Sequence, residues 1–237
     1  MEREIGAYAM TGKVVVVTGA NGGLGRHVTQ AFLDAGATVV GVSPTIQQAD
    51  FRSSAFAALP TEISSATAKN MVETVIARFG RLDVVAHTVG GFAGGQLVSE
   101  TDDATFQRML ELNLNSTFYL LRAVVPAMRK TGNGRIIAIG SRAAVDPGPS
   151  VGAYSASKAA MVSLIQTVAR ENKDAGITAN VILPGTIDTS ANREAMPNAD
   201  VSKWVQPANI ASLITWLAGD AGKDVNGAVI PVYGSDV

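Results

Sequence analysis

The sequence predicts an α/β fold, in which helices cover both faces of a seven-stranded parallel sheet in a single doubly wound domain. Short β-branched segments alternate with amphipathic segments along the whole chain. Strands that are separated by helices pair in parallel through right-handed crossovers. The 237 residues contain no internal repeat, linker or low-complexity segment, so we expect one domain over residues 1–237.

Seven segments are rich in β-branched and other apolar residues, which is typical of the buried strands of a parallel sheet. The third of them is the weakest prediction, because residues 45–60 show no clear period. The predicted strands cover residues 13–17, 38–42, 56–59, 82–88, 135–139, 178–183 and 228–232.

The segments between these strands carry apolar residues at intervals of three and four, which predicts helices with one buried face. The first helix ends at Gly36, since glycine readily adopts the left-handed conformation that ends a helix. Ser64 is a candidate cap for the second. The predicted helices cover residues 24–36, 64–79, 102–128, 154–172 and 207–217, and residues 185–206 are expected to form a polar loop.

The composition excludes several classes of protein. Hydrophobic residues make up 47% and charged residues 16% of the chain, which excludes a disordered or collagen-like protein. The net charge is −1 with no basic block, so we expect no nucleic acid and no membrane as partner. The chain has no cysteine, which excludes disulfides and thiolate chemistry, and we expect no metal site. No apolar signal segment follows Met1, which predicts a cytoplasmic protein.

A glycine-rich turn joins the first predicted strand to the first predicted helix, with the spacing Gly19-x-x-x-Gly23-x-Gly25. Gly19 allows a tight turn, Gly23 lets the backbone approach a pyrophosphate, and Gly25 lets the helix pack close to the sheet. The helix N-terminus offers N–H groups and the positive end of its dipole to phosphates. The turn therefore predicts nucleotide binding of the Rossmann type, rather than a simple strand-to-helix connection.

Tyr154 and Lys158 lie four residues apart on a predicted helix, so their side chains share one face. A tyrosine with its ordinary pKa of about 10 is a poor acid–base group at neutral pH. An ammonium about 4 Å away would stabilise the phenolate by on the order of 4 kcal/mol and lower the pKa of Tyr154 toward about 7. We therefore expect a general acid–base, with Ser141 donating a hydrogen bond to a developing alkoxide.

Together, these motifs resemble the short-chain dehydrogenase/reductase family over residues 12–234. The resemblance implies reversible hydride transfer between NAD or NADP and a small-molecule carbonyl or alcohol substrate, without a metal. The motifs stand in order at the expected strand ends, and beyond the glycine turn and the Tyr–Lys pair they include Asn113, Ser141, Pro184 and Gly185.

The resemblance also implies the role of each residue. Tyr154 would transfer the hydroxyl proton, Lys158 would lower the pKa of Tyr154 and bind the nicotinamide ribose, and Ser141 would orient the carbonyl. Asn113 would help to hold a water in a proton relay, and Thr189 would bind the nicotinamide carboxamide. The implied coenzyme-binding residues are Gly19, Asn21, Gly23, Leu24, Gly25, Ser43, Thr61, Gly90, Tyr154, Lys158, Pro184, Gly185, Ile187 and Thr189.

Three places depart from the family pattern. Residues 87–90 read His-Thr-Val-Gly where many members have Asn-Asn-Ala-Gly, and we expect His87 to bond neighbouring backbone rather than to act in catalysis. Thr61 stands where an Asp often contacts adenine. Ser43 ends the second strand, where an acid would select NAD through the ribose 2′-hydroxyl. The choice of coenzyme stays open, with a lean to NADP. Arg26 opens the first predicted helix, where its side chain either reaches the 2′-phosphate of NADP or faces solvent.

Two other functions stay open. Residues 90–95 and 183–204 resemble the loops of quinonoid dihydropteridine reductases, so reduction of a quinonoid pteridine is the alternative, although that branch usually lacks a serine such as Ser141. A non-catalytic dinucleotide-binding regulator is a remote alternative. The substrate itself is not readable, because the aromatic and sulfur side chains that favour an apolar or planar substrate equally suit the packing of a lid. They are Phe92, Met196 and Trp204.

The resemblance also predicts a homo-oligomer, a tetramer, because the helices over residues 102–128 and 154–172 pair with their mates in the family. Both helices carry apolar residues beyond a single core stripe, namely Leu110, Phe118, Leu121, Met161 and Leu164.

Overall fold

The computed structural model describes residues 9–235, whose strands form one sheet in the order β3-β2-β1-β4-β5-β6-β7. Every pairing in it is parallel. The predicted doubly wound fold is confirmed, and each strand begins and ends within two residues of its predicted range. The strands are β1 (Val14–Thr18), β2 (Thr38–Ser43), β3 (Phe56–Pro60), β4 (Val84–His87), β5 (Gly134–Ile139), β6 (Ile177–Pro184) and β7 (Val229–Val232).

The strand order reverses between β1 and β4. β2 and β3 continue the sheet on one side of β1, whereas β4 to β7 continue it on the other. Thr18 and His87 are register partners at the carboxyl ends of these two strands. In an open α/β sheet, ligands bind outside the carboxyl ends of the strands at such a reversal. The topology therefore points to the loops after β1, β4, β5 and β6.

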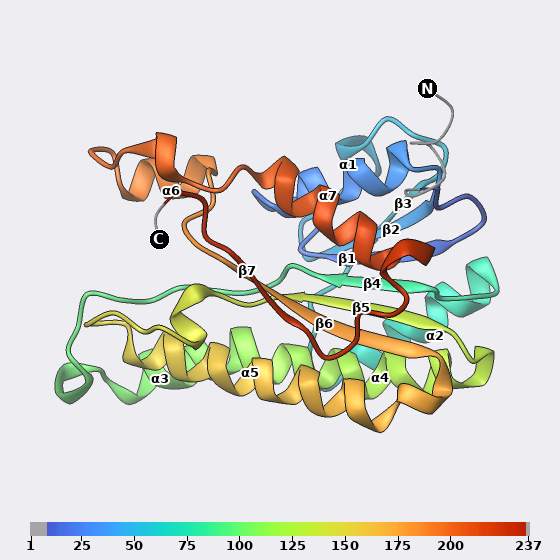
Figure 1. Cartoon of the computed structure of the whole chain (residues 1–237). Coiled ribbons are helices and arrows are strands. Elements are labelled where there is room, and N and C mark those ends of the chain that lie inside the picture. Colours follow the sequence, from blue (N-terminus) through green and yellow to red (C-terminus); the bar gives the residue numbers. More distant parts are fainter. Residues whose placement is uncertain (1–8, 236–237) are drawn as a thin grey trace.

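Helices cover both faces of the sheet (Figure 1). α1 and α7 lie on one face, where Phe32 packs with Val17, and α2, α4 and α5 lie on the other, where Met161 packs with Val16. Consecutive strand residues thus enter opposite cores, as the pleat requires. The helices are α1 (Gly25–Asp34), α2 (Ala68–Phe79), α3 (Asp103–Met109), α4 (Ser116–Thr131), α5 (Gly152–Glu171), α6 (Ser190–Ala195) and α7 (Pro207–Ala218).

The predicted helix over residues 102–128 is interrupted by a change of helical type. α3 and α4 are joined by a π-helical segment, Leu110–Asn115. π turns inside helices are frequent at functional sites, and this one carries Asn113. The predicted polar loop over residues 185–206 also differs from expectation, because it contains α6, which Thr189 caps.

Ser64 does not cap α2, contrary to the prediction. The helix begins at Ala68, with Thr67 at the N-cap position. The Ser64 hydroxyl oxygen instead accepts hydrogen bonds from the backbone N–H groups of Ala66 and Thr67, at 3.3 Å each. Ser64 therefore closes the turn before the helix.

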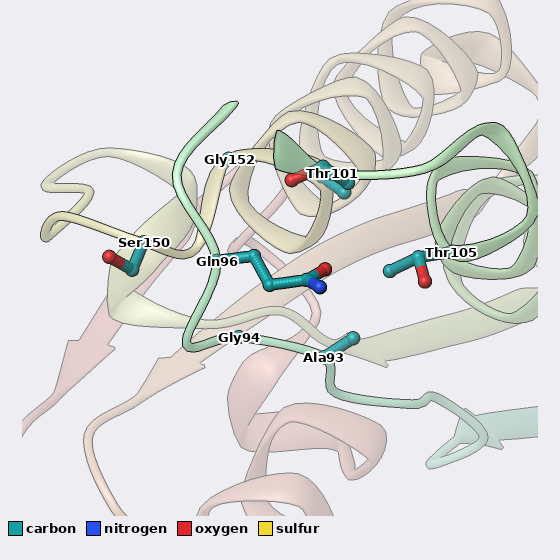
Figure 2. Close-up of a pocket in the computed structure, with 8 residues that line it drawn as sticks. Ala93, Gly94, Gln96, Thr101, Thr105, Ser150 and Gly152 are labelled. Carbon is teal, nitrogen blue, oxygen red and sulfur yellow. The ribbon is translucent and has the colours of Figure 1, made fainter. Parts of the chain in front are cut away.

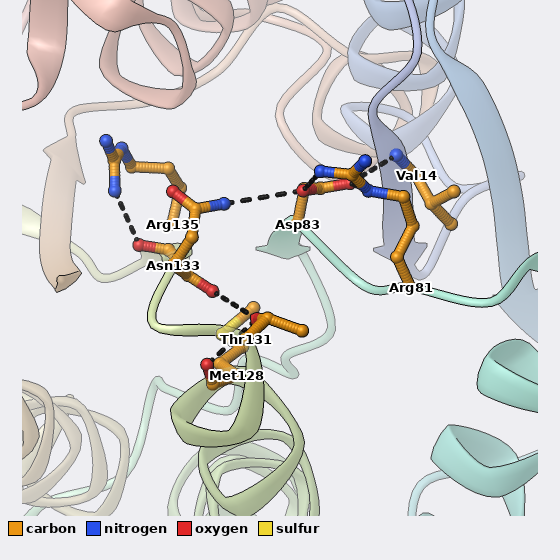
Figure 3. A network of polar contacts seen from close by, with 8 residues as sticks. Val14, Arg81, Asp83, Met128, Thr131, Asn133 and Arg135 are labelled. Atoms are coloured by element: carbon orange, nitrogen blue, oxygen red, sulfur yellow. Dashed lines mark hydrogen bonds and ion pairs between the residues drawn. The ribbon is translucent and has the colours of Figure 1, made fainter. Parts of the chain in front are cut away.

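A buried carboxylate ties together the amino ends of the central strands (Figure 3). Asp83 accepts the backbone N–H of Val14 at 2.9 Å and two hydrogen bonds from the Arg81 guanidinium, at 2.8 and 2.6 Å. The Asn133 amide donates a further bond at 3.3 Å. This network joins β1, β4 and the turn before β5 at the edge opposite the carboxyl ends, so its role is structural.

Within residues 9–235, no helix combines the length and the apolar character needed to cross a bilayer. The same stretch contains no group of three or more His, Asp or Glu side chains placed to hold a metal ion.

Candidate active site

The glycine turn after β1 is too closely packed for side chains. Gly19 has a φ of +70°, and an added Cβ there would lie 2.9 Å from the Thr88 hydroxyl oxygen. That hydroxyl donates to the carbonyl oxygen of Thr18 at 2.7 Å, which holds the loop after β4 against β1. An added Cβ at Gly25 would lie only 1.9 Å from the carbonyl oxygen of Gly19. The predicted reasons for glycine at these two positions agree with the packing.

The N-terminus of α1 is suited to an anion. Its first turn carries no acidic residue, and Leu24 at the N-cap provides no side-chain hydrogen bond. The N–H groups and the positive dipole end therefore face the turn without a competing carboxylate. An added Cβ at Gly23 would lie 2.8 Å from a methyl carbon of Thr189, so the loop after β6 reaches over the glycine turn. The residues at this turn therefore fit the pyrophosphate of a dinucleotide.

Tyr154 lies in the first turn of α5, and its phenol lies near the side chain of Ser141, which follows β5, so that an interaction with the Ser141 hydroxyl lowers the pKa of Tyr154. The structure thus brings these two predicted residues together. It does not show the expected fall in the pKa of Tyr154, because burial raises this pKa by more than the interaction with Ser141 lowers it. The expected pKa took into account the nearby Lys158 ammonium but not the desolvation of the phenolate, which has the larger effect here. The phenol is therefore protonated at neutral pH and able to donate.

Lys158 lies one helical turn after Tyr154 and is buried, with 4% of its surface exposed. Its ammonium donates to the carbonyl oxygen of Ile139, at the end of β5, at 2.8 Å. Burial lowers the pKa of Lys158 to about 8, so the group still carries its charge at neutral pH. An added Cβ at Gly90 would lie 2.9 Å from both the Lys158 ammonium and the Asn113 side-chain oxygen. Glycine at this position lets the loop after β4 contact both residues.

Asn113 holds three parts of the site together. Its side chain accepts the N–H of Gly91 and donates to the Gly91 carbonyl oxygen, each at 3.0 Å. The same amide donates to the Ser157 hydroxyl at 3.0 Å, and that hydroxyl donates to the Tyr154 carbonyl oxygen at 2.7 Å. Ser157 was not among the predicted site residues, although its place three residues after Tyr154 on the same helix was a usable signal.

His87 behaves differently from the prediction. Its Nδ1 lies 2.7 Å from the Thr18 hydroxyl, so its partner is a side chain rather than neighbouring backbone. Its Nε2 is buried and has no hydrogen-bond partner among the described residues. Burial, and then the charge of Lys158, lowers the pKa of His87 to about 3. The imidazole is therefore neutral and lies beneath the site.

The end of β2 carries no acidic side chain. Ser43 is buried there, and its carbonyl oxygen accepts the N–H of Thr61 at 3.2 Å, which brings these two predicted residues together. Beside them, the Asn21 amide donates to the Thr45 hydroxyl at 3.0 Å. Arg26 donates to the Asn21 carbonyl oxygen at 3.0 Å and forms an exposed ion pair with Asp50, N to O 3.4 Å. This edge therefore presents a guanidinium and hydroxyl groups.

The loop after β6 closes the other end of the site. An added Cβ at Gly185 would lie 2.8 Å from the Tyr233 carbonyl oxygen, so a side chain does not fit. Gly185 follows Pro184, the buried last residue of β6, and Ile187 forms a parallel bridge with Val205. The Thr189 hydroxyl oxygen accepts the backbone N–H of Asn192 at 3.3 Å and caps α6.

Phe92, Met196 and Trp204, which could serve either a substrate or the packing of a lid, differ in their exposure to solvent. Phe92 is exposed, and its ring lies edge-on to the Tyr154 ring with centroids 5.0 Å apart. Met196 is also exposed. Trp204 is only 9% exposed, so it packs the loop rather than facing a substrate.

The comparisons agree with this geometry. The family model of the short chain dehydrogenases matches residues 13–200. The chain is 31% identical over 236 residues to a 3-oxoacyl-(acyl-carrier-protein) reductase of Salmonella typhimurium, covering 94% of this chain and 96% of that protein. It is 30% identical over 247 residues to a 7alpha-hydroxysteroid dehydrogenase of Escherichia coli, covering 96% and 95%.

A solved structure described as ElxO with NADP bound has the same fold, with a TM-score of 0.88 and 23% identity over 94% of this chain and 97% of that one. The relatives named here are dehydrogenases and reductases of carbonyl or alcohol groups, so neither pteridine reduction nor a purely regulatory role is favoured. The chain belongs to the short-chain dehydrogenase family and is an NAD(P)-dependent oxidoreductase that acts on a carbonyl or alcohol substrate.

Proposed function

We propose that Tyr154 is the general acid–base of this oxidoreductase and that Ser141 orients the substrate oxygen beside it. The observation that carries the proposal is that the fold brings the Tyr154 phenol and the Ser141 side chain close together at the carboxyl end of β5, one helical turn from the buried Lys158. When bound, the nicotinamide supplies or accepts the hydride at the substrate carbon. In the direction of reduction, the Tyr154 phenol donates its proton to the carbonyl oxygen, and the Ser141 hydroxyl donates a hydrogen bond to the same oxygen.

We propose that Lys158 and Asn113 position this pair and the coenzyme. The Lys158 ammonium is buried one turn from Tyr154, so its charge acts through a medium of low dielectric constant. It favours the phenolate that forms when the proton leaves, and it has donors left for the nicotinamide ribose. Asn113 fixes the loop after β4 through Gly91 and fixes α5 through Ser157. It would support the proton relay that restores Tyr154.

We propose NADP as the preferred coenzyme. Ser43 does not repel a 2′-phosphate, whereas a carboxylate at that position would. Arg26 lies in the first turn of α1, beside Asn21 and the loop after β2. The ion pair of Arg26 with Asp50 lies at the surface, where such pairs contribute only about 0–1 kcal/mol to stability. The Arg26 guanidinium can therefore turn to a phosphate at little cost. Thr61 would contact the adenine from the neighbouring strand end.

Steady-state kinetics of Tyr154→Phe test the role of Tyr154. The substitution keeps the ring and removes the hydroxyl, so kcat should fall by about 10²–10⁴-fold, while coenzyme binding stays within about twofold. Tyr119→Phe on α4 is the matched control and should resemble the wild type. Lys158→Ala should lose rate and also weaken coenzyme binding, and Ser141→Ala should lose rate alone. A Tyr154→Phe enzyme with kcat within about threefold of wild type would contradict the mechanism.

We propose a homotetramer that pairs α4 and α5 with their mates. Leu121 and Met161 do not support it, because both are buried in the core of the subunit. The support comes from Phe118, which is 43% exposed on α4 beneath the Arg122 guanidinium, and from the partly buried Leu164. Light scattering at micromolar concentration should give about four times the 24.5 kDa of the chain. A single domain over residues 1–237 and a cytoplasmic location stay predictions.

A further inference from the structure

Most of the exposed apolar side chains lie on loops at one end of the sheet. Seven large hydrophobic residues are exposed among residues 9–235, and five of them lie on the three loops that follow β4, β5 and β6. These loops lie at the same end of the sheet as the N-terminus of α5, whose first turn contains Tyr154 (Figure 1). Soluble proteins leave grouped apolar side chains in water chiefly where something binds. The five residues are Phe92, Leu97, Val98, Val145 and Met196.

Phe92 has the most informative position of these. It is 69% exposed, and its ring meets the Tyr154 ring at 74° with centroids 5.0 Å apart. The edge-on contact leaves most of the Phe92 side chain exposed next to the Tyr154 ring, whose hydroxyl would hold the substrate oxygen. A group attached to the carbonyl carbon would therefore contact Phe92, whichever coenzyme is used.

The backbone around Phe92 holds the ring in this place. An added Cβ at Gly94 would lie 2.8 Å from the tip of the Phe92 ring, and one at Gly91 would lie 2.5 Å from a methyl carbon of Leu112. Gly95 donates its N–H to the Ser150 carbonyl oxygen at 2.8 Å, which ties the loop to the segment before α5. The ring is thus presented to the site by a packed loop, so little ordering remains to be done when a ligand arrives.

A cavity of about 190 Å³ lies against the loop that carries Phe92 (Figure 2). Four uncharged polar residues line it, and the amide of Gln96 points toward Thr105 in that view. Ala93 and Gly94 line it from the Phe92 loop, and Gly152 and Ala153 line it from the turn before Tyr154. No charged residue is among those that line it. The polar lining residues are Gln96, Thr101, Thr105 and Ser150.

Two arginines on the neighbouring loops pair with carboxylates of their own loops. Arg142 pairs with Asp146 at 2.9 Å, and Arg193 makes two bonds to Asp188, at 2.5 and 2.8 Å. Each of these guanidinium charges is thus balanced locally, and the lining of the cavity is uncharged. Both observations favour an uncharged molecule.

We propose that the substrate is a neutral ketone, or the matching secondary alcohol, with an aromatic or alicyclic body, and that Phe92 selects it by packing against that body. The inference rests on the proposed function, because it uses Tyr154 to place the carbonyl. It assigns specificity to the Phe92 loop and leaves Trp204 as packing within the loop after β6. A hydroxyl or second carbonyl at the far end of the molecule would fit the Gln96 cavity.

The test compares four probes, acetophenone, cyclohexyl methyl ketone, acetone and pyruvate, in wild type, Phe92→Ala and Phe92→Leu. Phe106→Ala is the matched control, because Phe106 is an exposed phenylalanine on α3 outside the three loops. In Phe92→Ala, kcat/KM for acetophenone and cyclohexyl methyl ketone should fall by about tenfold or more, while that for acetone changes by less than about threefold. Phe92→Leu should restore part of the loss, and Phe106→Ala should match wild type.

Calorimetric binding of 1-phenylethanol to the NADPH-loaded protein provides a readout without turnover, because the reduced coenzyme cannot accept a hydride from the alcohol. The affinity should also fall about tenfold in Phe92→Ala. An equal loss for all ketones in Phe92→Ala, or a wild type that prefers pyruvate, overturns the inference. If no ketone is reduced but 1-phenylethanol binding depends on Phe92, the proposed function fails, and of the inference only the packing of Phe92 against the ligand survives. If the ketones are reduced and 1-phenylethanol binding does not depend on Phe92, the proposed function stands and the inference fails.

Discussion

Acidification should destabilise this protein through His87, one of only two histidines in the chain. The ring is buried, its Nδ1 lies 2.7 Å from the Thr18 hydroxyl, and its Nε2 has no partner among the described residues. A protonated ring would carry two N–H donors with one partner between them. Burial and the nearby Lys158 charge therefore hold the pKa of His87 at about 3.

The sign and size of the effect follow from linkage. In the unfolded chain, water surrounds the same histidine, and its pKa is about 6.5. Because the folded pKa is the lower one, the unfolded state takes up the proton first, and stability is lost as the pH falls from about 6.5 to about 3. With a folded pKa of about 3, the free energy of unfolding should drop by about 2 kcal/mol between pH 8 and pH 5 from this group.

Urea unfolding of wild type, His87→Asn and His27→Asn at both pH values measures this contribution. His27 is exposed on α1 and is the matched control. The carboxylates and Lys158 titrate alike in all three proteins, so they cancel when the pH-dependent losses are compared. Between pH 8 and pH 5, the free energy of unfolding of His87→Asn should drop by about 2 kcal/mol less than that of wild type. The drop for His27→Asn should equal that of wild type. Equal losses in wild type and His87→Asn would show that the buried imidazole is not the group responsible.

Three further substitutions test the frame of the site. Asp83→Ala should lower the free energy of unfolding by about 2–3 kcal/mol in urea, with kcat and KM unchanged, because the carboxylate serves only the opposite edge of the sheet. Gly25→Ala should weaken coenzyme binding at least about tenfold by calorimetry, since its Cβ meets the Gly19 carbonyl at 1.9 Å, whereas Gly22→Ala, at 3.2 Å, should be milder. Ser43→Asp should shift the ratio of kcat/KM for NADPH over NADH by about tenfold or more toward NADH; an unchanged ratio would remove Ser43 from coenzyme selection.

The succession of strands and helices along the chain and the glycine turn could be predicted because both depend on local patterns. A β-branched run followed by an amphipathic segment forms the same unit wherever it occurs, and crossovers of one hand arrange such units in a parallel sheet. Gly25 was predictable for a similar reason, because the close helix–strand approach that requires it is a property of the turn itself. Tyr154 and Lys158 shared a helix face by spacing alone.

The environment of those residues came only from the tertiary structure. The pKa of Tyr154 rises because distant segments bury the phenol, and no spacing along α5 reports that desolvation. His87 bonds Thr18 because β1 and β4 lie side by side, although 69 residues separate them. Asn113 meets Ser157 across 44 residues in the same way.

The sequence by itself therefore determined the fold, the family and the identity of the chemical groups, since each depends on residue type and near spacing. The tertiary structure decided which of these groups are buried, charged or exposed. It separated the exposed Phe92 from the packed Trp204, which the sequence left equivalent. The physical reason is that burial and electrostatic fields sum over every neighbour in space, and most of those neighbours are remote along the chain.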